Sequence, residues 1–193
     1  KKAKKSSYSK KKKPTIISTG MSTYEEILKT QRIFNKFKTP HIFLHCTSAY
    51  PSTNLDKNLK CIPKLSSLLN EDVGFSGHGI GSVGASGAVA LGAKVVEKHV
   101  TLSRKMLGPD HAASLEFGEF AEMVNLSRGI KVALGSDQKK FLKSEKVLHD
   151  VLIRKFVTRK NVKKDEKIHF NNVKTSCKTF TDFKNFFWSE PNA

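Results

Sequence analysis

Two histidines are candidate metal ligands, because each lies close to the end of a short apolar run. His78 follows the run 73–76 after one glycine, and His99 lies within the run 93–100. Imidazole nitrogens bind several divalent cations, and a cation held by two of them keeps positions open for water or substrate. Histidines also serve as ordinary polar residues in many folds, so the spacing alone leaves a metal site and a purely structural pair as alternatives.

Hydroxyl and carboxyl side chains occur at equivalent places along the chain. Ser18 follows the first apolar run, Ser48 and Tyr50 follow the second, Ser76 ends the third, and Asp110 lies in a polar loop beyond the fourth. Hydroxyl groups can donate hydrogen bonds to the oxygens of a phosphate or carboxylate. The alternative for the serines and for Asp110 is a local role in turns and helix caps. The sequence contains no Walker motif, nucleophile elbow or CxxC pair.

The elements that must position these residues alternate along the chain. Parallel βα units produce such an alternation, and they bring the carboxyl ends of their strands, where ligands bind, to one edge of the sheet. The candidate residues are therefore expected to meet at that edge. Strands are expected over 15–17, 41–46, 73–76 and 93–100, and helices over 22–37, 59–69, 83–92 and 117–134.

Five motifs occur in order along the chain, namely IISTGMSTYEEI (16–27), LHCTSAYPSTNLDKNL (44–59), VGFSGHGIG (73–81), GAVALGAKVVEKHVTL (87–102) and GPDHAASLEFGEF (108–120). Together they resemble the sialic acid synthase family, and within it the animal N-acetylneuraminate-9-phosphate synthases. The resemblance implies an α/β fold, the C-terminal half of a TIM (β/α)8 barrel with four βα units. Eight such units need about 200 to 250 residues, so the other four are expected ahead of this sequence.

The same resemblance implies a reaction and a division of roles. Phosphoenolpyruvate would condense with N-acetylmannosamine or its 6-phosphate, and water would add to C2 as phosphate leaves, giving N-acetylneuraminate or its 9-phosphate. A divalent cation, Mn²⁺ or Mg²⁺, is the implied cofactor, and a homodimer is the implied assembly. By resemblance His78 and His99 are the catalytic, metal-binding residues, Ser18, Ser48 and Ser76 contact phosphoenolpyruvate, and Tyr50 and Asp110 face the sugar.

Beyond the barrel segment the composition changes. The string VLIRKFVTRKNVKKDEKIHFNNVK (151–174) resembles the small antifreeze-like (SAF) domain of the family, and its residues predict a strand over 151–157 and a turn at 163–166 before 168–170. Asp165 stands in this turn where the family usually has glycine, the residue that best tolerates a positive φ. The expected organisation is a basic tail (1–13), a partial barrel (14–135), a linker (136–146) and an incomplete β-rich SAF-like module (147–193).

The charge of the chain suggests an alternative function. The 193 residues carry 35 Lys and Arg against 17 Asp and Glu, a net charge of +18. Segments 1–13 and 138–193 each carry +8, whereas 14–137 has 13 basic and 11 acidic residues. A nearly neutral centre argues against a dedicated nucleic-acid binder, although a non-catalytic protein that holds polyanions through its basic ends remains the alternative. Three cysteines without a CxxC pair and the lack of a long apolar stretch predict a reduced cytoplasmic setting without a membrane span.

Overall fold

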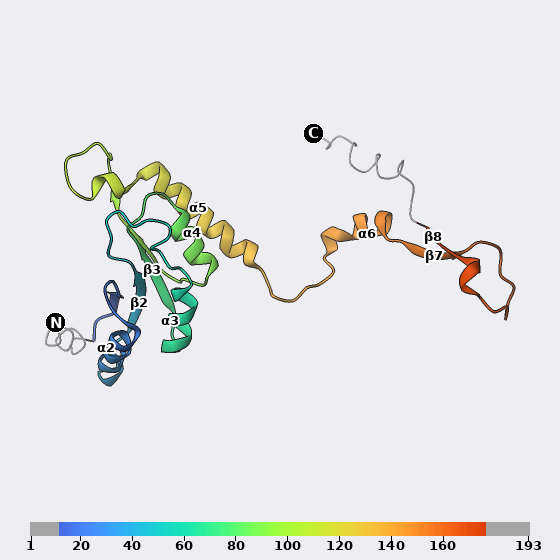
Figure 1. Cartoon of the computed structure of the whole chain (residues 1–193), viewed down its shortest axis with the longest axis horizontal. Helices are drawn as coiled ribbons and strands as arrows, with labels where there is room; N and C mark the ends of the chain where they lie inside the picture. Colours follow the sequence, from blue (N-terminus) through green and yellow to red (C-terminus); the bar gives the residue numbers. More distant parts are fainter. Residues whose placement is uncertain (1–11, 177–193) are drawn as a thin grey trace. The chain divides into compact units, whose positions relative to one another are not determined.

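The computed structural model describes residues 12–176. The chain divides into two units, which meet in sequence between Gly135 and Ser136 and are described separately (Figure 1). Most of the predicted basic tail and the aromatic run from Phe180 to Trp188 lie outside the described residues. No helix in the described part of the chain is long and apolar enough to cross a membrane.

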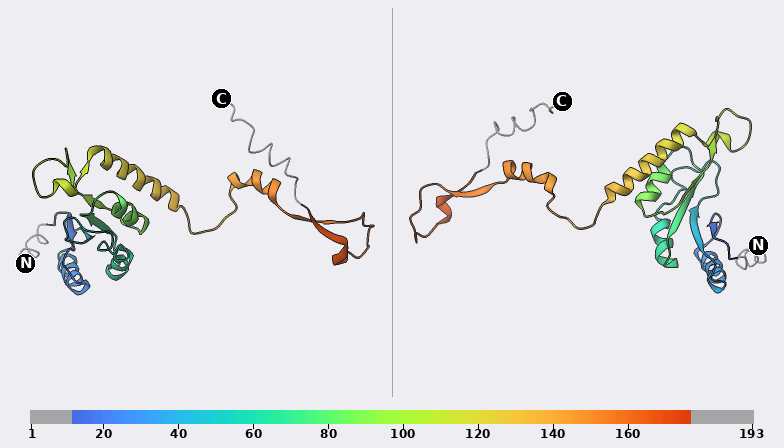
Figure 2. Two further views of the ribbon diagram at one scale, coloured as in Figure 1. Left: turned by 45° about the horizontal axis from the view of Figure 1, so that its top comes forward. Right: turned by 180° about the vertical axis from the view of Figure 1, so that it is seen from behind.

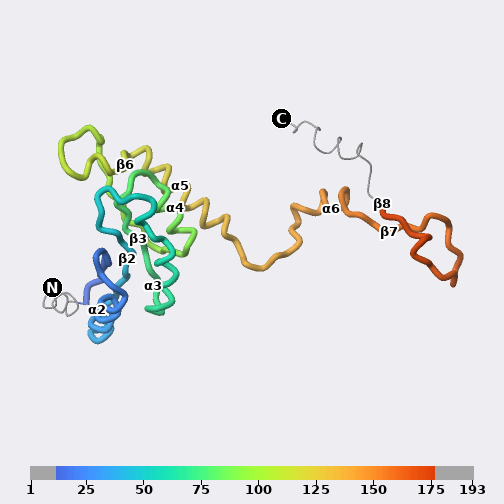
Figure 3. The backbone as a smooth tube through the Cα atoms, viewed as in Figure 1, coloured from blue at the N-terminus to red at the C-terminus, as the bar shows by residue number. Residues whose placement is uncertain are grey.

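The first unit is built on a four-stranded parallel sheet whose strands follow one another in chain order. Each strand is joined to the next by a helix, and α5 follows after the last strand, so four βα units form a half-barrel (Figure 3). The register places Cys46 beside Ser76, and Gly77 beside Lys98. The strands are β1 (Thr15–Ser18), β2 (His41–Cys46), β3 (Val73–Gly77) and β4 (Val96–Lys98), and the helices are α2 (Tyr24–Lys36), α3 (Cys61–Leu69), α4 (Val83–Ala90) and α5 (Phe117–Leu134).

Local sequence sets the ends of the longer helices. Thr23 caps α2: its side chain accepts from the Glu26 amide, and the Glu26 carboxylate accepts from the Thr23 amide at 2.9 Å. This reciprocal arrangement satisfies two of the amide groups that every helix start leaves unpaired. Gly135 ends α5, as expected from its position after the last apolar residue of the helix.

The core lies between the sheet and the helices. Phe43 and Phe75 of the strands pack with Ile62 and Leu65 of α3, and each is almost fully buried. Burying an apolar side chain of this size contributes about 1.5 to 3 kcal/mol. Helices α3 and α4 contact the strands and α5 packs on α4 (Figure 2). The buried face of α4 consists of Gly84, Ala85 and Ala88.

The predicted fourth strand is longer than the observed one. The sheet strand β4 covers only three residues, and β5 (Val100–Thr101) pairs instead with β6 (Leu115–Glu116) in a separate two-stranded sheet. His99 lies between the two strands, and its carbonyl accepts from the Leu115 amide at 3.0 Å. The chain therefore leaves the main sheet at a candidate metal ligand. The loop that follows contains a 3₁₀ turn, η1 (His111–Ala113).

The second unit contains an antiparallel hairpin in which β7 pairs with β8. The strand predicted over 151–157 is wrong in its first part, because Val151 and Leu152 end a helix. Residues 168–170 form a coil that enters a 3₁₀ turn. The predicted turn is present, and Asp165 adopts the left-handed conformation with φ of 67°. The elements are η2 (Lys143–Glu145), α6 (Lys146–Leu152), β7 (Lys155–Thr158), η3 (Phe170–Asn172) and β8 (Val173–Ser176).

Candidate active site

The predicted site residues lie at or just beyond the carboxyl ends of the parallel strands. Ser18 is the last residue of β1, and Ser76 is the penultimate residue of β3. His78 and His99 each follow directly after a strand, β3 and β4 respectively. Because neighbouring parallel strands end at the same edge of the sheet, these positions share one edge, as predicted.

Three aromatic rings form the centre of this edge. The ring centroids of His78 and His99 are 5.3 Å apart, and the Tyr50 ring lies 4.2 Å from His78 and 6.0 Å from His99. His78 is buried, whereas Tyr50, on the loop after β2, is exposed over 56% of its surface. The two imidazoles are thus neighbours, and Tyr50 covers them on the solvent side.

The hydrogen bonds of His78 indicate its tautomer. Its Nδ1 lies 3.0 Å from the carbonyl oxygen of Thr47, which can only accept, so Nδ1 carries the proton. Its Nε2 therefore has a free lone pair and accepts from the Tyr50 hydroxyl at 3.2 Å. The Cys46 thiol lies 3.8 Å from Nδ1 on the buried side. The lone pair that a cation would use points toward Tyr50.

Tyr50 remains a neutral phenol near neutral pH. Partial burial is the main cause that raises the pKa of its hydroxyl above 10.0, and the electrostatic influence of Cys46, Asp110 and Glu97 raises it further. Asp110 is therefore near enough to act on Tyr50 electrostatically. Its own backbone carbonyl accepts from the Ser114 hydroxyl at 2.7 Å, which fixes the loop at the start of η1.

Glu97 joins the site although the sequence reasoning did not select it. The hydroxyl of Ser76 donates to its Oε1 at 2.6 Å, and the two residues are direct partners in the β3–β4 register. Alternation along a strand places residues two apart on the same face. The position of Glu97 two residues before His99 was therefore the feature that could have identified it.

The loops after β1 and β2 touch through Gly20 and Ser48. A Cβ atom at Gly20 would lie 2.0 Å from the Ser48 hydroxyl oxygen and 3.2 Å from the Cys46 sulfur. Only a residue without a side chain leaves the Ser48 hydroxyl in its place. Ser18 lies two residues before this contact and is exposed. The structure thus brings the loops that carry the predicted serines together.

Two lysines flank the loop that carries His78. Lys98 donates to the carbonyl oxygen of Gly79, and its pKa is lowered mainly by burial and then by the nearby charge of Lys57. Lys57 is itself buried, and its ammonium donates to Asn54 at 2.6 Å. Cβ atoms at Gly79 and Gly84 would lie 2.6 and 2.9 Å from the Lys57 side chain. Neither lysine was selected from the sequence.

The donor set fits a divalent cation with open coordination positions. Within residues 12–176, no group of three or more His, Cys, Asp or Glu side chains forms a metal cluster. Two adjacent imidazoles are present, and His78 donates from Nδ1 to a backbone carbonyl, the arrangement that orients metal-binding histidines. His78 and His99 could therefore hold a cation whose remaining ligands are water, substrate or groups outside the described residues.

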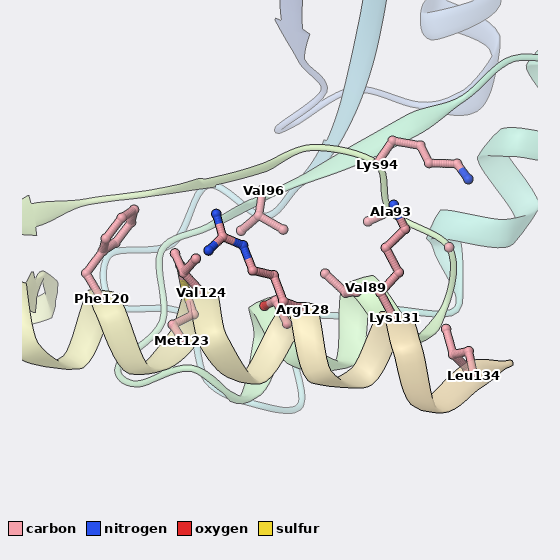
Figure 4. A pocket seen from close by; sticks show the side chains of 12 residues that line it. Val89, Ala93, Lys94, Val96, Phe120, Met123, Val124, Arg128, Lys131 and Leu134 are labelled. Atoms are coloured by element: carbon pink, nitrogen blue, oxygen red, sulfur yellow. The ribbon is translucent and has the colours of Figure 1, made fainter.

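A separate cavity of about 370 Å³ lies between α4, β4 and α5 (Figure 4). Its apolar lining includes Val96, Phe120 and Met123, and the side chains of Arg128 and Lys131 rise from α5 beside it. None of the candidate site residues lines it. The predicted chemistry therefore belongs to the open edge of the sheet and not to this cavity.

Comparison with known proteins covers most of the chain. Residues 6–139 match the model of the protein family described as the NeuB family. A pseudaminic acid synthase of Campylobacter jejuni is 43% identical over 172 residues, covering 89% of this chain and 50% of that protein. The human N-acetylneuraminate-9-phosphate synthase is 40% identical over 151 residues, covering 78% of this chain and 42% of that protein. The chain thus spans about half the length of the curated relatives it matches.

Solved structures show the same fold. An N-acetylneuraminic acid synthetase from Leptospira borgpetersenii, determined with citrate, superposes with a TM-score of 0.71 at 34% identity, over 76% of this chain and 51% of that chain. A phospho-2-dehydro-3-deoxyheptonate aldolase from Thermotoga maritima, 20% identical, matches in fold alone with a TM-score of 0.59. These likenesses confirm the predicted α/β half-barrel. The matched family and the relatives confirm the resemblance seen in the motifs, and the chain belongs to the NeuB family of sialic acid synthases.

Proposed function

We propose that this chain carries the cation-binding part of the active site of a synthase for a sialic-acid-type sugar. The observation that carries the proposal is the group formed by His78, His99 and Tyr50, within 6.0 Å ring to ring, at the carboxyl edge of a NeuB-family half-barrel. The relatives are named for the synthesis of pseudaminic acid, diacetyllegionaminic acid and N-acetylneuraminate 9-phosphate. The proposed substrates are phosphoenolpyruvate and an N-acetylated amino sugar, N-acetylmannosamine or its 6-phosphate.

A divalent cation such as Mn²⁺ or Mg²⁺, held by His78 and His99, would polarise the aldehyde oxygen of the open-chain sugar. The Tyr50 hydroxyl donates to His78 Nε2 at 3.2 Å. One lone pair of Nε2 cannot accept from Tyr50 and bind a cation at the same time. If Nε2 held the cation, the Tyr50 hydroxyl would be free to donate its hydrogen bond to a substrate oxygen. The raised pKa of Tyr50 keeps that proton in place near neutral pH. We assign Tyr50 and Asp110 to the sugar.

The serines form the proposed contact with phosphoenolpyruvate. The Ser48 hydroxyl is exposed at the contact between the first two loops, and Ser18 is exposed at the end of β1, so both can donate to an anionic oxygen. Ser76 differs, since its proton is already donated to Glu97. Ser76 can therefore bind the anion only by giving up Glu97 as its acceptor, and Glu97 holds the hydroxyl in position until then.

The test is release of inorganic phosphate from phosphoenolpyruvate by the purified chain, with Mn²⁺ or Mg²⁺ and with each of the two sugars. Phosphate release should depend on both cation and sugar, and the sugar that supports it decides between the two products. The chain spans only half the length of its relatives, so binding is measured independently of turnover. Calorimetric titration with Mn²⁺ and with phosphoenolpyruvate measures each binding step.

His78→Ala should abolish Mn²⁺-dependent turnover and weaken Mn²⁺ binding, because it removes one of two imidazole ligands. His149→Ala, which alters an exposed histidine of the second unit, is the matched control and should change neither. Equal Mn²⁺ binding by the wild-type chain and by His78→Ala would refute the assignment of the cation site.

A further inference from the structure

One hydrogen bond joins the immediate neighbours of the two candidate metal ligands. Lys98 directly precedes His99, Gly79 directly follows His78, and the Lys98 ammonium donates to the Gly79 carbonyl oxygen. No ion pair of Lys98 is found within residues 12–176, so this carbonyl is its direct partner there. Neither the cation nor the substrate chemistry proposed above uses this side chain.

The strand register explains how the lysine reaches the loop. Gly77 and Lys98 are partners at the end of the β3–β4 ladder, and Gly79 lies two residues further along. Lys98 directly follows Glu97 in β4, so alternation directs its side chain to the strand face opposite to the Glu97 carboxylate, which accepts from Ser76. Lys98 therefore reaches the Gly79 carbonyl from that opposite face.

The two histidines need such support because neither belongs to the sheet. β3 ends at Gly77 and β4 ends at Lys98, so His78 and His99 each lie one residue beyond the hydrogen-bonded ladder. A second backbone bond, from the Ser52 amide to the His78 carbonyl at 3.2 Å, ties the loop to the segment after β2. Within residues 12–176, the bond from Lys98 ties the loop after β3, which begins with His78, to the chain segment that carries His99.

The bond also has the character of a strong one. A charged ammonium is the donor, and Lys98 is partly buried, where hydrogen bonds to charged groups are stronger than at an open surface. Lys57 places a second positive charge nearby and occupies the space beneath Gly79. The Lys98 ammonium is held at the carbonyl by attraction to the carbonyl dipole.

We propose that Lys98 is a positioning residue for the two-histidine site, and that its bond to the Gly79 carbonyl sets the separation at which His78 and His99 receive a divalent cation. This inference rests on the proposed function, because it assumes that the two imidazoles bind the cation. Lys98 itself touches neither cation nor substrate. Its effect should appear in cation affinity and not in the folding of the chain alone.

The experiment is a titration of the full 193-residue chain with Mn²⁺, following free Mn²⁺ by electron paramagnetic resonance. Lys98→Met keeps the aliphatic stem and removes the donor, and it should raise the Mn²⁺ Kd about tenfold or more, within the range seen when groups supporting metal ligands are removed. Lys98→Arg keeps a charged donor and should stay within about threefold of wild type. Lys94→Met, an exposed lysine just before β4, is the control and should bind as wild type does.

Circular dichroism and thermal melting without Mn²⁺ accompany each titration, so that lost affinity is separated from lost structure. If Lys98→Met does not fold, Lys98→Gln and Lys98→Arg give the same comparison. Wild-type affinity in folded Lys98→Met or Lys98→Gln, while His78→Ala binds more weakly, would overturn the positioning role and leave the cation site intact. Absence of Mn²⁺ binding by the wild-type chain would refute the cation site and, with it, the role of Lys98.

Discussion

Replacing Gly20 with alanine should weaken phosphoenolpyruvate binding without unfolding the chain. The new Cβ would lie 2.0 Å from the Ser48 hydroxyl oxygen, a distance that forces this oxygen to move. The backbone at Gly20 is not in the left-handed region, so alanine brings no backbone strain of that kind. The perturbation is therefore confined to the place where the loops after β1 and β2 meet.

The size of the effect follows from what Ser48 loses. A hydrogen bond to a charged group contributes about 1.5 to 3 kcal/mol, and about 1.4 kcal/mol corresponds to a factor of ten. Displacing the hydroxyl should raise the Kd for phosphoenolpyruvate about 10- to 150-fold. Once Ser48 is alanine, the nearest remaining atoms are the Cys46 sulfur at 3.2 Å and the Cβ of residue 48 at 3.3 Å, which need only small shifts. In the Ser48→Ala background, Gly20→Ala should then weaken phosphoenolpyruvate binding by less than about 0.5 kcal/mol more.

Calorimetric titration with phosphoenolpyruvate, in wild type, both single variants and the double variant, gives the four affinities required. Gly118→Ala is the matched control, because a Cβ there meets nothing within 4 Å. Thermal melting by circular dichroism should show all five proteins folded. Full additivity of the two substitutions would refute the steric reasoning, and wild-type affinity in folded Ser48→Ala would refute the role of Ser48 itself.

Two further predictions concern pH and stability. Because the fold raises the pKa of Tyr50, the neutral phenol stabilises the folded state below pH 10, and this stabilisation should be lost as pH rises through the folded-state pKa. Between pH 8 and 11 the free energy of unfolding, measured with urea, should fall more steeply for wild type than for Tyr50→Phe. Parallel pH curves for the two proteins would contradict this. Glu71 Oε2 lies 3.2 Å from Nε2 of His41, and neither of these buried atoms makes a hydrogen bond in the described part of the chain. Glu71→Ala should cost about 1 to 3 kcal/mol of unfolding free energy, because it leaves the buried His41 nitrogen without a polar group beside it, whereas exposed Glu122→Ala should cost almost nothing; equal losses would contradict a stabilising contact between Glu71 and His41.

The first unit could be predicted well because its local and tertiary preferences agree. The strand at 41–46 and the helix at 117–134 have the predicted bounds, since each is an uninterrupted pattern bounded by polar or glycine residues. The second unit was predicted less well. Val151 and Leu152 belong to an apolar run too short for its period to separate strand from helix, and in the structure they end α6. The partner that pairs with β7, at 173–176, shows no alternating apolar pattern.

The residues of the site were also only partly predictable from the sequence. The positions of the two histidines and of Tyr50 followed from the rule that ligand groups gather at the carboxyl ends of parallel strands. The contribution of Lys98 could not be found in this way, because its side chain acts on a backbone carbonyl, which every residue has. Glu97 was within reach of sequence reasoning, since it lies two residues before His99 and opposite Ser76 in the β3–β4 register.

The buried side chain of Lys57 has a consequence for how sequences of this family can diverge. Its stem and ammonium fill the space that Cβ atoms at Gly84 and Gly79 would need. A larger residue at either glycine therefore becomes acceptable only after Lys57 has been replaced by a shorter side chain, and the order of the two changes matters. In an alignment of relatives, position 57 should covary with positions 79 and 84, and chimeras that combine a lysine at the first with a bulky residue at either glycine should fold poorly.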